Sequence, residues 1–528
     1  MNNLHQRRLP TIGTIIAFIM LLGGVQMNAF AASGSSETAE QETGSLRFIV
    51  RDAGTGALVP CRVYLRNHAG EPQRCEPLPF WHDHFTCEGV AELKPGTGEY
   101  SYEIASGKEY SIAAGSVIIE KQMAQTVSVD LERIADLASN GWYAGDLHNH
   151  RTVQEMPLLM RAENIHIGYV PFYWGYHPLK RRNPRPDRKD LLVELDGGRF
   201  LFQNTYEDER FDGTAMIFNL FKTLDIPAPD HQMPPVIALI ETAMAIPGAW
   251  IHADRPYWWE YPTWLACARI DSLEVINNNF WRHAFIDNEA WGRQRDLEKY
   301  PPPFGNALYT QDLYFHTLNS GFRIPPAAGS ASGVPHTPFG YNRVYVQVDG
   351  EMNWEKWWAG LRGGRCFVSN GPLLQVKAND KWPGHVFTAP KGETVAVYLK
   401  MELVSRDAIS AIEIIRNGHV VRTLSAAEWK NNGGLGQLEF DESGWFLVRA
   451  LTDVAHTYRF AMTGPFYVEI GEQKNRISAA SVDVFLDWAI DAKENAKKAP
   501  PEKQAAIASY HERSIQFWKK RLTEANAE

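Results

Sequence analysis

The chain has 528 residues, of which 44% are hydrophobic and 12% aromatic, a composition that favours large folded cores and excludes a disordered chain. Its 53 Lys and Arg residues against 62 Asp and Glu residues give a formal net charge of −9. No Lys/Arg-rich run stands out from this acidic background, so nucleic acid and anionic membranes are poor candidate partners. The length predicts several domains, and we expect three.

Residues 1–31 have the pattern of a signal peptide. Arg7 and Arg8 precede the apolar run TIGTIIAFIMLLGGV, and a small-x-small cleavage site ends at Ala31. The run is shorter than the roughly 20 residues that span a bilayer, so we predict export to the periplasm or the medium and no membrane span. An uncleaved N-terminal anchor is the alternative. Cleavage removes two basic residues and takes the net charge from −9 to −11.

A polar linker at 32–45 leads into a segment, 46–131, with short alternating stretches such as LRFIVRD, CRVYLRN and SYEIASG. The turn clusters DAGTG and KPGTGEY separate them, which predicts a small β-sandwich. The stretch VRDAGTGALVPCRVYL resembles transthyretin-like and carboxypeptidase-regulatory modules. None of the five cysteines has CxxC spacing, which excludes zinc-ribbon and thioredoxin motifs. In an oxidising compartment Cys75 and Cys87 are candidates for closing a short loop.

From 140 to 372, strand-like runs such as IGYVPFYW, GAWIHAD and SLEVINN alternate with helix-compatible stretches such as MPLLMRAE. This alternation predicts a barrel-like α/β domain in which functional residues lie at the strand ends. The segment 373–472 returns to strand patterns and predicts a C-terminal β-sandwich. The segment 473–528 predicts a helical tail interrupted by prolines.

The stretch WYAGDLHNHRT at 142–152 carries the most specific signal. On a strand, Asp146, His148 and His150 would project from one face and converge. Two further histidines, in the stretch FWHDHF, have the same spacing. Because they lie inside the first predicted sandwich, we interpret them as surface or loop histidines.

The GDLHNH part of this stretch resembles the opening motif of the PHP (polymerase and histidinol phosphatase) superfamily of metal-dependent hydrolases, in particular its exported CehA/McbA-type branch. The stretches PPAAGSASGVPHTPFGYNRVYV and GRCFVSNGPLL are similar to closing segments of that branch. The resemblance covers roughly residues 140–375. It implies a distorted (β/α)₇ barrel with a divalent-metal site at the strand ends, flanked here by the two β-sandwiches and the helical tail.

Carried over residue by residue, the resemblance assigns a metal site. His148 and His150 match the first metal-binding motif, Glu207 in FQNTYEDER fits a strand-end carboxylate, and His252 in GAWIHADRP fits a later strand-end histidine, although a buried core histidine is the alternative there. With Asp146 these are the predicted metal ligands, for zinc, manganese or iron, because imidazole favours transition metals. Two departures leave the metal count open. The usual TDH is absent unless His177 is its displaced histidine, and the usual closing GSDxH reads AGSASGVPH.

Other residues are predicted to support this site. We expect Arg151, Arg255 and Arg343 to grip an anionic substrate, since guanidinium matches phosphate and carboxylate, with pairing to neighbouring carboxylates as the alternative. Trp250 and the aromatic residues after it would line a pocket for a flat or sugar-like ligand, or belong to the core. We expect Asp254 and Glu260 to orient the metal-binding histidines from outside the ligand set, and Glu274 to face the mouth of the barrel.

The predicted function is an exported metal-dependent hydrolase that uses a metal-activated water on a phosphoester, ester or carbamate, in a small-molecule or glycan-type substrate. Its catalytic residues would be His148, His150, Glu207 and His252. There is no GxSxG elbow and no P-loop, which argues against serine catalysis and nucleotide phosphoryl transfer. One alternative is a non-catalytic, degenerate protein that binds a glycan or a cell-surface component, which the AGSASGV stretch favours. Another is a glycoside hydrolase that uses Glu207 with Glu274. The oligomeric state stays open.

Overall fold

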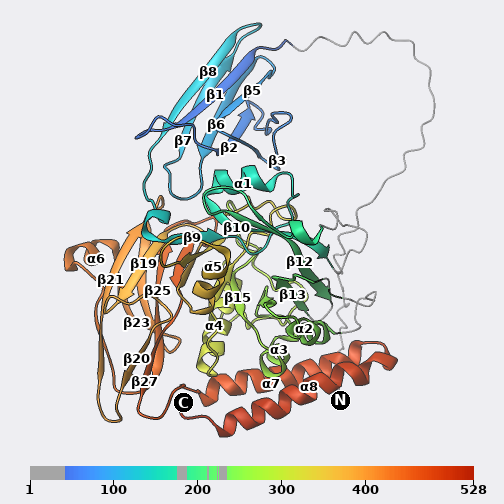
Figure 1. Cartoon of the computed structure of the whole chain (residues 1–528), viewed down its shortest axis with the longest axis vertical. Coiled ribbons are helices and arrows are strands. Elements are labelled where there is room, and N and C mark those ends of the chain that lie inside the picture. Colours follow the sequence, from blue (N-terminus) through green and yellow to red (C-terminus); the bar gives the residue numbers. More distant parts are fainter. Residues whose placement is uncertain (1–41, 175–186, 211–212, 223, 225–234) are drawn as a thin grey trace, which may run out of the picture. The chain divides into compact units, whose positions relative to one another are not determined.

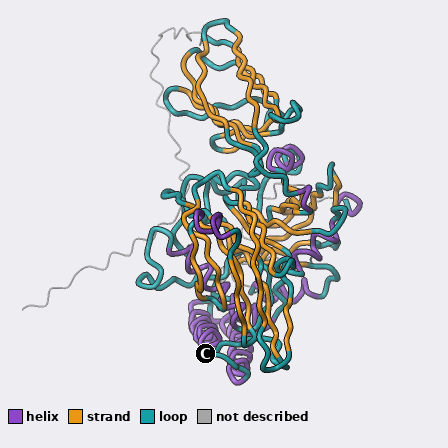
Figure 2. The backbone as a smooth tube through the Cα atoms, turned by 90° about the vertical axis from the view of Figure 1, so that its left-hand side faces the viewer, coloured by secondary structure: helices purple, strands orange, loops and turns teal. Residues whose placement is uncertain are grey.

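The computed structural model describes residues 42–174, 187–210, 213–222, 224 and 235–528. These residues belong to one compact unit, Glu42–Glu528. The predicted signal peptide and most of the predicted linker lie outside the described residues. Within the described part, strands dominate over helices (Figure 2).

The first region consists of two β-sheets that share one apolar core (Figure 1, blue to cyan). One sheet has the order β5-β1-β8 and the other the order β3-β4-β2-β6-β7. Alternate residues of β1 are buried, as expected for a strand with one face on a core. The strands are β1 (Ser45–Asp52), β2 (Cys61–Asn67), β3 (Phe80–Trp81), β4 (His84–Cys87), β5 (Val90–Leu93), β6 (Gly98–Ala105), β7 (Ala113–Ile119) and β8 (Ala124–Leu131).

Cys75 and Cys87, the candidates for closing a short loop, are not bonded to each other. Cys61 in β2 lies opposite Cys87 in β4, with the two sulfur atoms 3.7 Å apart, and all five cysteines are free thiols. The thiol of Cys75 donates to the carbonyl of Glu92. Spacing in the sequence could not reveal this because strand register, and not loop length, brings Cys61 to Cys87.

The central region is not the predicted (β/α)₇ barrel. Its strands belong to one mixed 16-stranded sheet with the order β16-β15-β14-β13-β12-β10-β9-β17-β18, which then continues into C-terminal strands. Neighbours are parallel in the pairs β9/β10, β10/β12, β14/β15 and β15/β16. In contrast, β12/β13, β13/β14, β9/β17 and β17/β18 are antiparallel. A (β/α)₇ barrel needs seven parallel strands whose sheet closes on itself, and this sheet mixes parallel with antiparallel pairs, so the predicted fold class was wrong.

The misprediction has a local cause. β12 (Phe200–Arg210) does not end at Glu207 but runs on and pairs antiparallel with β13 (Gly213–Phe218). An apolar run indicates burial but not the strand with which it pairs. The other central strands are β9 (Trp142–Gly145), β10 (Ile165–Trp174), β11 (Leu192–Glu194), β14 (Trp250–Ala253), β15 (Ser272–Ile276), β16 (Pro326–Ala328), β17 (Arg343–Gln347) and β18 (Cys366–Ser369).

The C-terminal strands extend the central sheet and cover it with a second one. β26 pairs with β18, and β25, β22 and β23 follow, while β19, β21 and β24 form a separate three-stranded sheet. Both sheets contribute to one apolar cluster that also contains residues of β9 and β10. The strands are β19 (Leu373–Ala378), β20 (Val386–Ala389), β21 (Val395–Val404), β22 (Ile409–Arg416), β23 (His419–Leu424), β24 (Gly436–Phe440), β25 (Gly444–Thr452), β26 (Phe460–Thr463) and β27 (Phe466–Ile470).

Two long C-terminal helices, α7 and α8, lie side by side (Figure 1, red). The Ser478 hydroxyl caps α7, and α8 starts with a proline in its first turn, where the missing N–H costs nothing. The indole of Trp518 donates to the carbonyl of Pro262 in α3 at 3.0 Å. The α-helices are α1 (Met156–Glu163), α2 (Val236–Met244), α3 (Tyr261–Cys267), α4 (Gly305–Asn319), α5 (Trp354–Arg362), α6 (Ala426–Asn432), α7 (Ala479–Asn495) and α8 (Pro501–Thr523).

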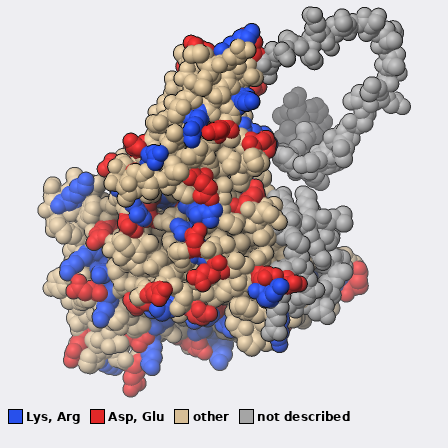
Figure 3. All heavy atoms as spheres, turned by 45° about the horizontal axis from the view of Figure 1, so that its top comes forward, with Lys and Arg blue, Asp and Glu red and all other residues tan. Residues whose placement is uncertain are grey.

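The distribution of surface charge and the character of the helices are relevant to possible partners. Acidic and basic side chains are interspersed on the face drawn in Figure 3. Among the helices that the structure describes, none has both the length and the apolar character needed to cross a bilayer.

Candidate metal centre

The motif residues follow the end of β9. The strand ends at Gly145, and the chain from Asp146 to His150 is a loop and not the strand that its alternation predicted. A side chain at Gly145 has no space, because its Cβ would lie 2.7 Å from the ring of Trp357. The loop nevertheless brings the imidazoles of His148 and His150 together, with ring centroids 5.3 Å apart.

The segment AGSASG at 328–333 holds this loop in place. The amide of Ala331 donates to the carbonyl of His148 at 2.5 Å, and the amide of His150 donates to a carbonyl of the segment at 2.6 Å. A Cβ at Gly329 would lie 2.2 Å from the Cβ of His148, so only glycine fits there. The small residues of this segment therefore have a packing role.

Glu207 joins the two histidines. Its carboxylate oxygens lie 3.6 Å from Nε2 of His148 and 3.3 Å from Nε2 of His150. One donor atom from each of the three residues lies within 4.8 Å of the other two, and each residue is at most 4% exposed. Two imidazoles and a carboxylate form a donor set that is able to hold a metal ion.

Glu274 and His252 extend this cluster. Oε2 of Glu274 lies 3.4 Å from Nδ1 of His148 and 3.0 Å from Nε2 of His252. The parallel register of β14 and β15 places His252 opposite Ser272, whose hydroxyl lies 2.8 Å from Nδ1 of His252. A second partner of this kind fixes the orientation of a metal-binding imidazole. His252 and Glu274 are fully buried.

Opposite charges in the cluster stabilise each other. Burial alone would raise the pKa of Glu207, but His150 and His148 lower it to about 2. Burial alone would lower the pKa of His148, but Glu274 and Glu207 hold it well above its ordinary value. Without a cation the cluster therefore keeps a proton on an imidazole, and a bound cation would replace that proton.

The cluster also has acceptor capacity to spare. Among the described residues, Oε1 of the buried Glu274 has no hydrogen-bond partner. Leaving such an atom unsatisfied costs roughly 1–3 kcal/mol, which coordination would recover. Imidazole and carboxylate donors fit zinc, manganese or iron better than magnesium or calcium. The residues present therefore fit a divalent transition metal.

Three further charged groups lie beside the cluster. Nε of Arg255 is 3.4 Å from Oδ2 of Asp254. Burial raises the pKa of Asp254 to about 6 against the opposing effect of Arg255. Burial and the neighbouring Glu207 raise the pKa of Glu209 to about 7. Carboxyl groups that titrate near neutrality are candidates for proton transfer.

Asp146, a predicted metal ligand, binds backbone amides. Its Oδ1 accepts from the amides of His148 and Ser330, at 3.2 and 3.0 Å, and its Oδ2 accepts from the amide of Gly340 at 2.7 Å. The side chain is fully buried, and burial raises its pKa to about 6 despite these bonds. The structure thus places Asp146 outside the three-residue cluster, as a brace between the ligand loop and the segment that holds it.

Two of the arginines predicted to bind substrate pair with glutamates. Arg151 lies 2.6 Å from Glu155, and its guanidinium is 5.1 Å from the centroid of the Trp81 ring. Arg343 lies 2.8 Å from Glu163 and is fully buried. The third, Arg255, is the one that lies near the cluster.

The aromatic residues around His252 belong to the core. Trp250 is fully buried and donates its indole N–H to Ser272 at 2.7 Å, so it supports the serine that orients His252. Glu260, expected to orient a histidine, instead accepts from the indole of Trp264 at 2.7 Å. The side chains of Tyr257, Trp258 and Trp264 are fully buried as well.

Sequence analysis missed some neighbours of the cluster. The ring of Trp174, at the end of β10, lies 4.7 Å from that of His150, and its indole donates to Glu209 at 3.0 Å. Its signal was the run IGYVPFYW alone, which does not distinguish a site residue from a core residue. His177 lies outside the described residues.

The comparisons with known proteins give no family. No family model matches the chain, and no curated protein matches it. Among solved structures, a minor pilin of Streptococcus agalactiae, GBS52, shares 18% sequence identity with it, over 18% of this chain and 47% of that chain, with a TM-score of 0.16. The match thus spans less than half of the pilin, and a likeness of this extent carries no argument about function.

Proposed function

We propose that the protein is a metal-dependent hydrolase that acts on a phosphoester, an ester or a carbamate. The observation that supports this proposal is the buried cluster of His148, His150 and Glu207, whose donor atoms lie within 4.8 Å of one another. A divalent cation bound there would supply the Lewis acid that such a hydrolysis needs and lower the pKa of the attacking water. Zinc, manganese and iron are the proposed ions.

In this proposal the surrounding residues have separate roles. His148, His150 and Glu207 hold the cation, with His252 and Glu274 next to them. Ser272 fixes the orientation of the His252 ring, and Asp146 fixes the conformation of the loop that carries His148 and His150.

Proton transfer and charge stabilisation fall to two other residues. Glu209, with its pKa raised to about 7, accepts and returns a proton near neutral pH. Arg255, beside the cluster, stabilises negative charge that develops on the substrate.

The relation to the PHP superfamily is part of this proposal, and it rests on the motif at 142–152 and on the closing segments. Export is also a proposal, and it rests on residues 1–31. N-terminal sequencing of the protein recovered from the periplasm or the medium tests export, with a new N-terminus at Ala32 as the expected result.

Metal content is the test of the proposed function. The mature protein, residues 32–528, is purified without chelator or affinity metal and analysed by ICP-MS beside the His148→Ala/His150→Ala double variant. We expect near-stoichiometric zinc, manganese or iron in the wild type and none in the double variant. A His68→Ala/His419→Ala variant, which removes two exposed histidines, is the matched control and should keep its metal. Absence of metal from the wild type, even after reconstitution, would refute the proposal.

A second candidate is a non-catalytic protein with a closed metal site. The observation that favours it is that all five residues of the cluster are at most 4% exposed, whereas catalytic sites keep one coordination position open. Cobalt substitution separates the two candidates. A visible spectrum that changes on addition of azide shows an open position and supports hydrolysis, and an unchanged spectrum supports the closed site. Turnover of p-nitrophenyl phosphate or p-nitrophenyl acetate would decide the reaction.

A further inference from the structure

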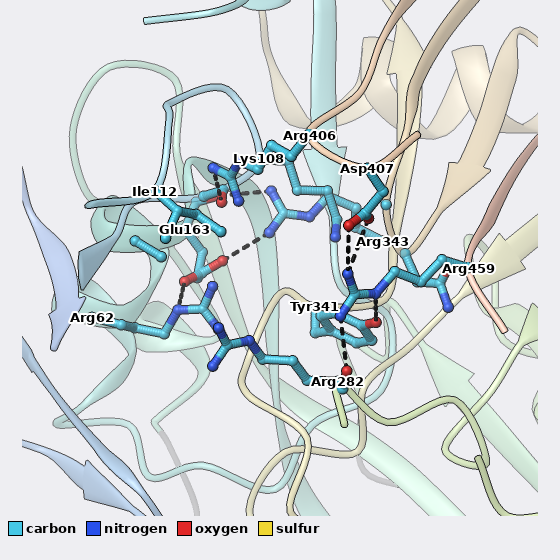
Figure 4. Close-up of a pocket in the computed structure, with 14 residues that line it drawn as sticks. Arg62, Lys108, Ile112, Glu163, Arg282, Tyr341, Arg343, Arg406, Asp407 and Arg459 are labelled. Carbon is cyan, nitrogen blue, oxygen red and sulfur yellow. Dashed lines mark hydrogen bonds and ion pairs between the residues drawn. The ribbon is translucent and has the colours of Figure 1, made fainter. Parts of the chain in front are cut away.

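A second polar cluster, which shares no residue with the metal centre, surrounds a cavity of about 80 Å³ (Figure 4). Its walls come from β2, from the loop between β6 and β7, from the end of α1, and from chain segments near residues 282, 341, 371, 406 and 459. Six cationic side chains line it: Arg62, Lys108, Arg282, Arg343, Arg406 and Arg459. Among the described residues, the carboxylates that line it with them are those of Glu163 and Asp407.

Both carboxylates are already engaged. Oε1 of Glu163 lies 2.5 Å from Arg62, and its Oε2 lies 2.8 Å from Arg343. The oxygens of Asp407 both accept from one nitrogen of Arg459, at 3.0 Å. These pairs use the acidic groups of the wall and leave cations without a counter-charge in it.

Among these cations, Lys108 most clearly lacks a negatively charged partner in the part of the chain that the structure describes. It is 8% exposed, and its ammonium lies 4.7 Å from the centroid of the Tyr341 ring. In the part of the chain that the structure describes, it forms no ion pair with a carboxylate. Burial, and then the charges of Arg343 and Arg406, hold the pKa of Lys108 well below its usual range. A buried ammonium among guanidinium groups is unfavourable unless an anion joins them.

Arg406 and Arg282 also line the cavity, and the hydrogen-bond partners that the structure describes for them place no further negative charge on its wall. Arg406 donates to the carbonyls of Tyr110 and Gly107, at 2.6 and 2.9 Å, and carbonyls carry no net charge. Arg282 pairs with Glu103, which does not line the cavity.

The size of the cavity limits the ligand. A water molecule needs roughly 10–15 Å³ of such space, so 80 Å³ accommodates a few waters or one compact ion but no sugar or nucleotide. Guanidinium groups bind the oxygens of phosphate and sulfate by paired hydrogen bonds, and a lysine adds a point charge.

We propose that this cavity binds a compact oxyanion of phosphate or sulfate size, either as the free ion or as the terminal group of a larger ligand. The cations on its wall exceed the carboxylates by four, and Lys108 has no carboxylate partner among the described residues. The proposal does not depend on the proposed hydrolase function, because none of the metal-centre residues lines the cavity.

Calorimetric titration with inorganic phosphate tests the site. The mature protein is stripped of metal with EDTA and dialysed, so that the metal centre cannot contribute, and sodium chloride at equal ionic strength is the reference. We expect phosphate to bind to the wild type and Lys108→Gln to bind it at least tenfold more weakly. Lys400→Gln, which removes an exposed lysine paired with Asp380, should bind phosphate as the wild type does.

Thermal unfolding gives an independent readout. In sodium chloride alone, Lys108→Gln should unfold at the same temperature as the wild type or higher, because the substitution removes like-charge repulsion. Phosphate should raise the unfolding temperature of the wild type but not that of the variant. A variant that is less stable in chloride, or a phosphate effect that both proteins share, would contradict the proposal.

Two further arms identify the source of the anion. If glycerol 3-phosphate binds as tightly as inorganic phosphate, the site takes the terminal group of a larger ligand. If only inorganic phosphate or sulfate binds, it takes the free ion. No binding of any of the three, at concentrations where chloride has no effect either, overturns the proposal.

Discussion

The metal centre and the oxyanion cavity are both buried and both rich in charge, but their charges balance in opposite ways. In the first, Glu207 and Glu274 surround imidazoles, and Oε1 of Glu274 lacks a hydrogen bond among the described residues. In the second, cations exceed carboxylates, and within the part of the chain that the structure describes Lys108 has no carboxylate partner. In a buried cluster the uncompensated group, and not the number of charges, indicates whether the ligand is a cation or an anion.

The two sites are also connected through Gly340. Its amide donates to Oδ2 of Asp146, in the ligand loop, at 2.7 Å, and its carbonyl accepts from Nε of Arg343, on the cavity wall, at 2.5 Å. Three substitutions test this comparison. One alters the metal centre, one alters the glycine that connects the two sites, and one alters a buried histidine that belongs to neither site.

The largest effect is expected from Glu207→Gln. The substitution keeps the size of the side chain but removes the charge that both His148 and His150 face, and we expect metal to bind roughly 100-fold more weakly or worse. Competition with a chromogenic chelator measures the affinity. The matched control is Glu260→Gln, which alters a buried carboxylate bonded to Trp264 and should retain the metal even if the fold is weakened. Equal losses in both variants would show that the effect is structural.

A second effect, on stability and not on metal affinity, is expected from Gly340→Ala. The backbone φ of Gly340 is +73°, and a Cβ there would lie 2.9 Å from the Cβ of Glu163 and 3.1 Å from a guanidinium nitrogen of Arg343. Strain and overpacking together should lower the free energy of unfolding by roughly 2–4 kcal/mol, measured by urea denaturation. Gly56→Ala, at a φ of +71° with open space around it, should lose only about 1 kcal/mol. A loss at Gly340 no larger than that at Gly56 would remove the argument for close packing there.

The smallest effect concerns His166, a histidine that is held neutral whereas His148 is held charged. Burial lowers the pKa of His166 to about 3, and its ring packs 4.9 Å from that of Tyr143. The unfolded chain takes up the proton first, near pH 6.5, so this residue destabilises the fold as the pH falls from about 6.5 to 3.

Urea denaturation at pH 8 and at pH 5.5 measures that contribution. His166→Phe should lose about 1.4 kcal/mol less stability between these two pH values than the wild type does. The buried His84 and His511, with pKa values lowered to about 4, remain in both proteins and cancel in the difference. An unchanged difference between the two pH values would show that His166 does not stay neutral in the folded protein.

The sequence predicted which residues come together at the candidate metal centre better than it predicted which strands pair. The prediction that His148 and His150 meet is confirmed, but its reason was wrong, because the chain from Asp146 to His150 is a loop and not a strand with alternate side chains on one face. The barrel was mispredicted because nothing in FLFQNTYEDER shows that β12 and β13 pair antiparallel. Arg343, predicted to bind substrate, lines the oxyanion cavity, whose walls come from residues as distant as 62 and 459, and no local pattern marks such a set.

The continuity of the sheet from β9 through β17 and β18 to β26 bears on how this protein was assembled in evolution. Val368 of β18 pairs with Met462 of β26, across more than ninety residues of chain. Cutting the chain after residue 372 would leave β18 as a bare edge strand with its apolar residues uncovered, a template for aggregation. The segments that follow the metal centre in the sequence are therefore not a detachable module that could be exchanged with another protein. Recombination would have to preserve them together with the strands that carry the ligands.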